Sequence, residues 1–266
     1  MNAAVVLMYH RLGEGALPGR EAGEESYAVT PAAFEAQLDV LASSRSKVTR
    51  LPALLDAVEG QGRLPARAVA ITFDDGNATD HHEALPILLR QGFDAAFFVT
   101  PAWVGTSGYM DWGQVRDLTA AGMTVGAHGL DHTLLSTLSG EALRLHLREA
   151  RRLLEARLGH APETLSLPGG AGGYEAVAAA RAEGFRFVFD SRPRRLGPRG
   201  SASAIPRFAV RRGDDIGSFR GLVEQSPAAL VRAWARYGAL SGLRAVVGPS
   251  VYSRVRGVRM RWGSAS

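Results

Sequence analysis

Short apolar runs rich in β-branched residues alternate along the chain with segments of helical periodicity. This alternation is typical of βα units that surround a parallel sheet. The runs expected to form strands are residues 3–8, 47–50, 68–73, 95–99, 124–127, 164–167, 186–189 and 205–210. The pattern therefore predicts an α/β fold with a mainly parallel sheet.

Two of the intervening segments carry clear helix signals. Thr30 and Pro31 suit the N-cap and first helical position of a helix that reaches about Ser43. A second helix is expected from about residue 140 to residue 158, with Gly159 as its stop signal. Its apolar face contains Leu143, Leu147, Ala150, Leu154 and Leu158.

Composition limits the kind of metal site that the chain can build. At 266 residues and 46% hydrophobic residues, the chain is long enough for one sizeable core, and we expect one α/β domain. Cys is absent, which excludes a disulfide framework and a zinc site built on thiolates. A transition metal would need His and carboxylate ligands.

Charge divides the chain into two parts. The formal net charge is +5, but seven arginines and no acidic residue follow Glu224, so the preceding part is close to neutral. We expect a catalytic barrel at residues 1–224 and a basic, Arg-rich extension at residues 225–266. The first ten residues lack a cationic start and their apolar run breaks at His10, which favours a cytoplasmic protein.

Two adjacent carboxylates follow the expected strand at residues 68–73. Asp74 and Asp75 leave this strand together, and Gly76 comes next. Adjacent residues at a strand end can diverge, so one carboxylate is free to bind a metal while the other acts as a base. The alternative is a simple Asp-Asp-Gly turn that caps the following helix.

Two histidines follow the expected strand at residues 124–127. His128 and His132 have an i, i+4 spacing, which lets both imidazoles reach one metal if the segment turns helically. Two His and one carboxylate, with open positions for water and substrate, form the ligand set of a catalytic zinc site. A pair of packed or surface histidines is the alternative.

Two more strand ends carry candidate groups. Gly169 and Gly170 follow the strand at residues 164–167, and glycines there allow backbone N–H groups to approach an oxyanion, although an ordinary tight turn also fits. His10 follows the first strand. Because all strand C-termini of a parallel barrel share one face, we expect these groups to lie around one site.

These motifs resemble those of the polysaccharide deacetylase (NodB-homology) family, especially its branch of biofilm-glycan de-N-acetylases. The resemblance covers about residues 4–220. Thr72-Phe-Asp-Asp-Gly76 matches the first family motif, and His128-Gly-Leu-Asp-His132 corresponds to the His-Ser/Thr-x-x-His motif, with Gly129 in the Ser/Thr position. Val6-Leu-Met-Tyr-His10 resembles the N-terminal strand of that branch. The resemblance implies a distorted (β/α) barrel of about seven parallel strands.

The resemblance also implies a role for each site residue. Asp75, His128 and His132 would bind a divalent metal ion, most simply Zn²⁺. Asp74 would be the general base, His10 the general acid, and the Gly169 N–H would stabilise the oxyanion.

One part of the family pattern is missing. Many members have an Arg in the third motif that orients the base, whereas Ser166 stands there in this chain. Arg207 is a candidate replacement. Asp190 corresponds either to a remnant of the fourth motif or to a cap, and we do not assign it to the site.

An aromatic group follows the expected strand at residues 95–99. Trp103, Tyr109 and Trp112 suit a platform on which a sugar stacks, and a packed edge of the core is the alternative. The expected substrate is an N-acylated amino sugar in a glycan or a cytoplasmic glycan precursor, from which acetyl is removed. The alternatives are a deformylase, a non-sugar amidohydrolase, or a catalytically silent glycan-binding barrel.

The basic extension begins with an amphipathic pattern at residues 227–237. Leu230, Trp234 and Tyr237 share one face of it, and Arg232 and Arg236 lie opposite. Such a segment suits an anionic membrane, so a peripheral position at the inner membrane face is one expectation. The alternative is that Leu230 and Trp234 cover the barrel while the arginines are solvated. No nucleic-acid partner is expected, because no binding motif accompanies this terminal basic region.

Overall fold

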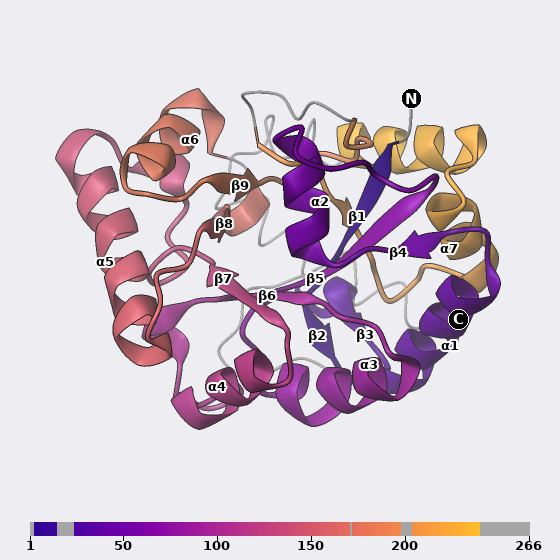
Figure 1. Ribbon diagram of the computed structural model, residues 1–266, viewed down its shortest axis with the longest axis horizontal. Helices are drawn as coiled ribbons and strands as arrows, with labels where there is room; N and C mark the ends of the chain where they lie inside the picture. Colours follow the sequence, from indigo (N-terminus) through magenta and orange to yellow (C-terminus); the bar gives the residue numbers. More distant parts are fainter. Residues whose placement is uncertain (1–2, 15–23, 171, 198–203, 240–266) are drawn as a thin grey trace.

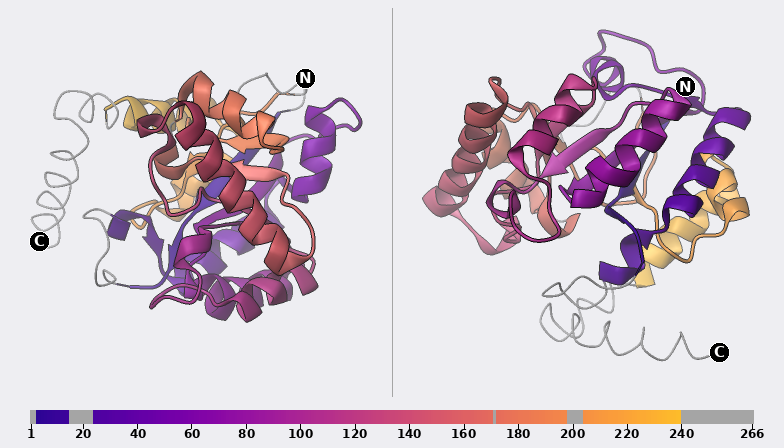
Figure 2. Two further views of the ribbon diagram at one scale, coloured as in Figure 1. Left: turned by 90° about the vertical axis from the view of Figure 1, so that its left-hand side faces the viewer. Right: turned by 90° about the horizontal axis from the view of Figure 1, so that it is seen from below.

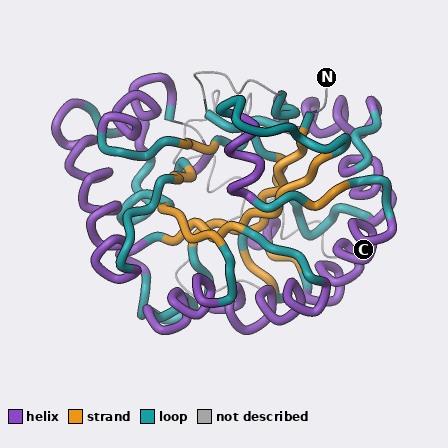
Figure 3. The backbone as a smooth tube through the Cα atoms, viewed as in Figure 1, coloured by secondary structure: helices purple, strands orange, loops and turns teal. Residues whose placement is uncertain are grey.

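A curled parallel sheet forms the centre of the protein, and helices surround it (Figure 1, Figure 3). The computed structural model describes residues 3–14, 24–170, 172–197 and 204–239. The strands of the main sheet are β1 (Ala4–Tyr9), β4 (Lys47–Val48), β5 (Ala68–Asp75), β6 (Ala96–Val99), β7 (Thr124–Ala127), β8 (Thr164–Ser166), β9 (Phe187–Phe189) and β10 (Phe208–Ala209). All of their pairings are parallel, which confirms the predicted fold class.

Seven of these strands form one continuous path, in the order β10-β1-β5-β6-β7-β8-β9. The eighth strand, β4, pairs with the first two residues of β5, and β6 pairs with β5 from Thr72 onwards. Residues 205–209 join the two ends of the path, because Ile205 forms a parallel bridge with Phe189 of β9 and Phe208 pairs with Leu7 of β1. The sheet therefore curls into the expected distorted barrel.

Side chains alternate between the inside of the barrel and the helical layer. Val5, Leu7 and Tyr9 of β1 belong to the larger hydrophobic cluster, which includes the inner faces of the outer helices. Ala4 and Val6 belong to a second cluster, which contains Leu51, Leu54 and Leu55 of α2 (Leu51–Val58). This period of two is that of a β-strand with both faces buried.

The outer helices are α1 (Pro31–Ser43), α3 (Leu85–Gln91), α4 (Trp112–Ala120), α5 (Gly140–Leu158), α6 (Gly173–Ala182) and α7 (Ile216–Val223). The prediction for α1 is confirmed, and the Thr30 hydroxyl accepts a hydrogen bond from the Ala33 N–H as its N-cap. α5 also has its predicted bounds, with Gly159 in the left-handed conformation at its end. α7 packs beside α1, although the two are far apart in the sequence (Figure 2).

The structure adds short elements that sequence periodicity does not reveal. β2 (Arg11–Leu12) and β3 (Ala28–Val29) form a separate two-stranded parallel sheet next to the end of β1. Most of the expected strands are also shorter than predicted, and of residues 205–210 only Phe208–Ala209 are assigned to β10. Residues 197–203, where Gly, Pro and Ser without periodicity predict a loop, lie outside the described residues apart from Gly197.

Residues 227–239 are helical, as the amphipathic pattern predicts. Leu230 and Ala233 pack against the larger hydrophobic cluster, whereas Trp234 is 58% exposed. Trp234 therefore does not cover the barrel together with Leu230, and that part of the expectation is wrong. The Arg-rich segment from residue 240 lies outside the described residues, so the division at residue 224 stays a prediction. None of the described helices is long and apolar enough to cross a membrane.

Gly126 of β7 provides a test of how the strands pack. A Cβ at this position would overlap the Thr164 hydroxyl and lie 2.7 Å from Cδ1 of Phe98. Gly126→Ala should therefore destabilise the protein by about 1–3 kcal/mol, as overpacked cores do, measured by chemical denaturation. Gly213→Ala is the matched control, because no atom lies within 4 Å of a Cβ there. Equal stability of the two variants would contradict the packing of β7 between β6 and β8.

Candidate active site

The candidate site lies at the C-terminal edge of the sheet, where strands from distant parts of the sequence end together. His10 follows β1, Asp74 and Asp75 end β5, His128 follows β7, and Gly169 follows β8. Because the strands are parallel, all of these positions are on the same edge of the barrel. The fold thus brings the separate motifs to one edge of the sheet, as predicted.

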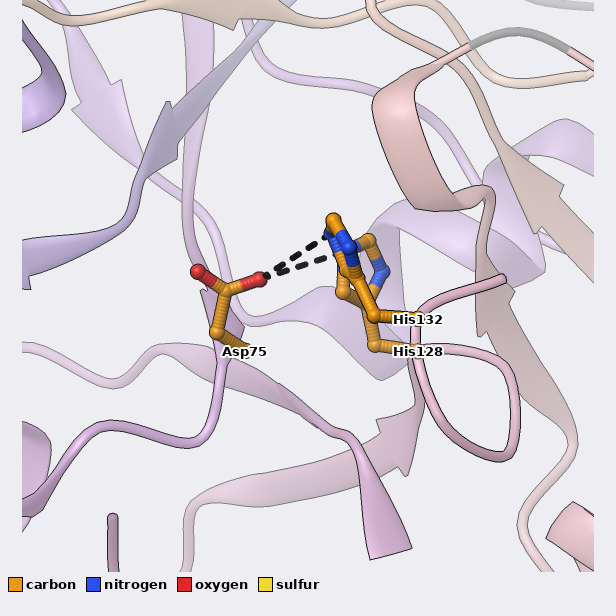
Figure 4. A group of neighbouring side chains, drawn as sticks. All are labelled: Asp75, His128 and His132. Carbon is orange, nitrogen blue, oxygen red and sulfur yellow. Dashed lines mark ion pairs between the residues drawn. The ribbon is translucent and has the colours of Figure 1, made fainter. Parts of the chain in front are cut away.

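Asp75, His128 and His132 form the group of potential metal ligands in the described part of the chain (Figure 4). Oδ1 of Asp75 lies 3.4 Å from Nε2 of His128 and 3.7 Å from Nε2 of His132. Ligand atoms at about 2.0–2.2 Å from a tetrahedral zinc ion are separated by about 3.4 Å. The two distances from Asp75 are therefore close to those in the coordination sphere of such an ion, and the donor atoms of all three side chains lie within 4.8 Å of one another.

The surrounding backbone orients these ligands. Nδ1 of His128 donates to the Ser166 carbonyl over 3.0 Å, which leaves Nε2 as the coordinating atom, as is common for metal-bound imidazoles. Asp75 and His132 both have positive φ values, 81° and 66°, in the region that non-glycine residues rarely adopt. Asp75 is the last residue of β5, so this conformation departs from the extended backbone at the point where the strand ends. Strained backbone of this kind concentrates at functional sites.

The loop from His128 to His132 is not the helical turn that the i, i+4 spacing suggested. Residues 129–131 form a turn, and Gly129 has a φ of 69°. His128 is almost fully buried, whereas the His132 side chain is 22% exposed. The ligand group is therefore open to solvent on the His132 side.

A buried ion pair fixes the second carboxylate. The Arg207 guanidinium donates to both oxygens of Asp74, with Nη1–Oδ1 and Nη2–Oδ2 distances of 2.7 Å. Arg207 is fully buried and Asp74 is 2% exposed. The Ser166 hydroxyl donates to Oδ2 of Asp74 over 3.1 Å and accepts a hydrogen bond from Nη2 of Arg207. Arg207 and Ser166 therefore form one network around the proposed base.

Arg207 is itself held from several sides. Its Nε donates to the Asp190 carbonyl, and its Nη1 donates to the Thr72 hydroxyl. The guanidinium also lies over the rings of Phe98 and Phe189, 5.4 Å and 5.9 Å from their centroids. The contact from Asp190 uses its backbone, while its carboxylate accepts the Arg192 N–H. Asp190 thus positions Arg207 through the main chain.

Electrostatics keep both aspartates ionised. Burial raises the pKa of Asp74, but the charges of Arg207 and His128 more than offset this, and the net shift is downwards. Burial likewise raises the pKa of Asp75, but the hydrogen bond to His128 and the nearby imidazoles bring it well below its usual range. Burial lowers the pKa of His128, yet the two carboxylates raise it more. A cation at this site would compete with that proton.

His10 lies beside the carboxylates at the end of β1. Burial lowers its pKa, and the charges of Asp75 and Asp74 oppose that shift only in part. Its ring packs against Tyr27, with centroids 4.7 Å apart and ring planes tilted by 30°, and the Arg211 guanidinium lies over Tyr27 at 4.7 Å from its centroid. Within the described residues, the buried Nδ1 of His10 has no hydrogen-bond partner. The contact with Tyr27 therefore orients this imidazole.

Of the three predicted platform residues, Trp103 lies against the ligand group and Tyr109 packs on Trp103. The Trp103 ring is 4.9 Å from the His132 ring and 4.8 Å from the Tyr109 ring, between centroids. Trp112 instead packs against the hydrophobic core beneath Arg157, whose Cζ is 5.4 Å from the Trp112 ring centroid. The alternative of a packed core edge thus applies to Trp112, and its assignment to the platform is wrong.

Gly169 is exposed at the end of β8 and has a φ of 65°, which only glycine adopts readily. Its neighbour Gly170 lies close to Ser191, where a Cβ would overlap the side chain. Gly169 is thus favoured by its backbone conformation, and Gly170 is required by the space that Ser191 occupies.

Several residues of the site have no clear sequence signal. The Asn77 amide donates to the carbonyls of Asp74 and His10 and so links the ends of β5 and β1. Thr72 and Ser166 supply hydroxyls around Arg207. The Ser166 position stands out only because an Arg is expected there, and Tyr27 lies in a segment without periodicity.

Comparisons with known proteins indicate one family. Residues 61–188 match the family model for polysaccharide deacetylase. A poly-β-1,6-N-acetyl-D-glucosamine N-deacetylase of Staphylococcus aureus is 23% identical over 230 residues, which cover 79% of this chain and 79% of the relative. YxkH of Bacillus subtilis, named for the same family, is 23% identical over 82% of this chain and 75% of its own length.

Solved structures show the same fold. IcaB from Ammonifex degensii superposes with a TM-score of 0.69 at 25% identity, over 88% of this chain and 97% of its own. The deacetylase PplD of Streptococcus pyogenes has a TM-score of 0.73 at 18% identity, over 85% and 99% of the two chains. The predicted family resemblance, the barrel and the enzyme class, a hydrolase of the polysaccharide deacetylase type, are confirmed.

The Asp74–Arg207 pair makes a stability prediction. Arg207→Ala leaves a buried carboxylate without its partner, which typically costs about 3–5 kcal/mol, and equilibrium denaturation should show a loss of that size. Arg207→Lys should recover part of it, because an ammonium group keeps the charge but not the bidentate geometry. A loss below about 1 kcal/mol for the Ala variant would mean that the pair is not formed as described.

Proposed function

We propose that this chain, which carries a polysaccharide deacetylase domain, removes acetyl groups from an N-acetylated amino sugar by metal-dependent hydrolysis. The observation that carries the proposal is the position of two separate groups at one sheet edge. One is the ligand group of Asp75, His128 and His132, and the other is the buried Asp74–Arg207 pair. A metal site beside a fixed carboxylate is what amide hydrolysis by activated water requires.

The proposed cofactor is a divalent ion, most simply Zn²⁺. Two imidazoles and one carboxylate are a ligand set of catalytic zinc sites that keep an open coordination position, and the distances between the donor atoms support it. When bound, such an ion lowers the pKa of a bound water and polarises the acyl carbonyl.

Asp74 is proposed to accept the proton of the attacking water. In the described part of the chain, Oδ2 of Asp74 accepts two hydrogen bonds, from Arg207 and Ser166, whereas Oδ1 accepts one from Arg207. Because a carboxylate oxygen has two lone pairs, Oδ1 retains an acceptor position for the water. Arg207 keeps the carboxylate ionised and holds its plane, and so acts as the base-orienting residue in place of the missing third-motif Arg.

His10 is proposed to protonate the departing amine. An amide nitrogen leaves poorly unless it is protonated, and an imidazolium with a lowered pKa is a stronger acid than one in water. The Gly169 N–H, at the same edge, is the candidate donor to the oxyanion. Tyr27 keeps the His10 ring in place by packing against it.

The proposed substrate is an N-acetyl amino sugar within a glycan or a lipid- or nucleotide-linked precursor. The Staphylococcus aureus relative is named for action on poly-β-1,6-N-acetyl-D-glucosamine, and Trp103 with Tyr109 offers a surface for sugar stacking next to His132.

A panel of N-acetyl and N-formyl amino sugars, from monosaccharides to β-1,6-linked oligomers, tests this proposal. Released acetate and formate are quantified separately, and acetate release from at least one glycan is the expected result. Formate release alone would indicate a deformylase. No release from any sugar by metal-loaded protein would contradict the proposed reaction.

The division of roles between the carboxylates predicts different losses. Asp74→Asn should retain about one metal ion per chain but lose about 100-fold or more in turnover, because it removes the proton acceptor and leaves the ligands intact. Asp75→Asn, His128→Ala and His132→Ala should each lose metal as well as activity. Metal analysis and acetate assays of the four variants give the comparison. Full metal content in His128→Ala and His132→Ala would exclude this ligand group.

The role of His10 predicts a dependence on the leaving group. His10→Ala should keep its metal and lose turnover on an N-acetyl sugar, but lose much less on an acetate ester of a phenol, whose leaving group needs no proton. The ratio of kcat for the two substrates is the measurement. An equal loss on both would assign His10 a role other than acid catalysis.

We also propose that the protein is cytoplasmic and attaches peripherally to the inner face of an anionic membrane. The charge of residues 225–266 supports this, since they contain seven arginines and no acidic residue. Val231 and Trp234, on the helix at residues 227–239, are 68% and 58% exposed. Each Arg close to anionic lipid contributes about 1 kcal/mol, so several together suffice for reversible attachment.

Liposome co-sedimentation tests the attachment. The full chain should bind vesicles that contain phosphatidylserine at low salt, bind neutral vesicles weakly, and be released at high salt because the attraction is screened. A chain that ends at Gly248 should bind less, since four arginines are removed. Equal binding by both chains, or no preference for the anionic vesicles, would reject the extension as an anchor.

A further inference from the structure

The loop that carries the two proposed His ligands is attached to the barrel on one side and to a helix on the other. On the β6 side, the His128 N–H donates to the Val99 carbonyl over 2.8 Å, and the Ala102 N–H donates to the Leu130 carbonyl over 2.9 Å. On the opposite side, the Leu130 N–H donates to Nε2 of His146 over 3.0 Å. His146 belongs to α5, and no mechanistic role above involves it.

Gly129 and His146 share the same space. Gly129 has a φ of 69°, and a Cβ there would lie 2.9 Å from Cγ of Pro168 and 3.3 Å from Nε2 of His146. A side chain at position 129 is therefore excluded by the backbone conformation and by these two neighbours. Gly129 has no hydroxyl to hold the turn, and the imidazole of His146 lies where such a group would be.

His146 is suited to accept this hydrogen bond. It is 9% exposed and lies on the buried face of α5 between Leu143 and Leu147. Accepting from an N–H requires that Nε2 carry no proton. Burial lowers the pKa of His146, and Asp131, whose Oδ1 lies 3.9 Å from Nε2, opposes this only in part. The neutral ring is thus favoured in the folded protein.

We infer that His146 is a positioning residue: its Nε2 accepts the Leu130 N–H, holds the turn between His128 and His132, and so fixes the spacing of the two metal ligands. The inference rests on the proposed metal site. Leu130 is equidistant in sequence from the two histidines, and His132 has a strained φ of 66°. Removing the contact from α5 would therefore release the partly exposed His132 more than the buried His128, whose Nδ1 is held by Ser166.

The experiment compares metal affinity in variants that separate hydrogen bonding from packing. His146→Leu fills the site without an acceptor, and His146→Gln keeps an acceptor oxygen. Leu143→Val, on the same face of α5, is the control for a simple packing defect. Zn²⁺ affinity is measured by chelator competition, and the ligand geometry is followed by the d–d absorption of the Co²⁺-loaded protein. Apo-protein melting temperatures report the packing cost of each change.

His146→Leu should lower Zn²⁺ affinity by about 10–100-fold, the range found when the contacts that orient metal ligands are lost, and should alter the Co²⁺ spectrum. His146→Gln should restore most of the affinity, and Leu143→Val should lower the melting temperature while leaving affinity unchanged. If His146→Leu does not fold, His146→Met takes its place with the same expected loss.

Wild-type affinity in the Leu or Met variant, or an equal loss in Leu143→Val, would overturn the role of His146. A wild-type protein that binds no metal would instead contradict the proposed function itself. The two failures are therefore distinguishable.

Discussion

The buried ion pair between Asp74 and Arg207 is the constraint on which the site depends. Burying two charges is costly unless each satisfies the other, and here the bidentate contact, Ser166 and the Thr72 hydroxyl supply the partners. Arg207 lies in the segment at residues 205–209 that joins the two ends of the sheet, while Asp74 lies in the central strand β5. The same interaction thus spans the barrel and fixes the proposed base.

The ligand group depends on this arrangement through backbone geometry. Ala68 and Ala70 of β5 belong to the second hydrophobic cluster. Thr72 and Asp74 continue this period of two and contact Arg207, and Asp75 at the end of the strand has a positive φ. This local conformation lets two successive aspartates take different roles. Asp74 forms the ion pair with Arg207, and Asp75 faces the imidazoles (Figure 4). Gly76, with a φ of 83°, continues the turn close to Val99.

Much of this could be predicted from the sequence because it is encoded locally. Apolar runs mark the strands, and the positions that follow them bear Asp74, Asp75, His128 and His10. A parallel sheet then brings these positions to one edge whatever the details of the helices. Arg207 was identifiable only as a candidate, since its role follows from how the ends of the sheet meet, which no local pattern contains.

The predictions that failed depend on tertiary packing. Trp112 begins α4 and packs beneath Arg157, whereas Trp103 lies beside His132, and spacing along the chain does not distinguish them. Trp234 shares a helical face with Leu230 but lies beyond the surface that Leu230 covers. His146 falls within an apolar helical face. Nothing in the sequence there indicates that its side chain accepts a hydrogen bond from the Leu130 N–H.

The most direct test of the account is a crystal structure of the protein grown with Zn²⁺, with anomalous differences measured at the zinc absorption edge. The account predicts one strong peak at about 2.0–2.2 Å from Asp75 Oδ1, His128 Nε2 and His132 Nε2, with Asp74 still paired with Arg207 and outside the coordination sphere. A peak elsewhere, or an ion that draws Asp74 away from Arg207 to become a ligand, would contradict it.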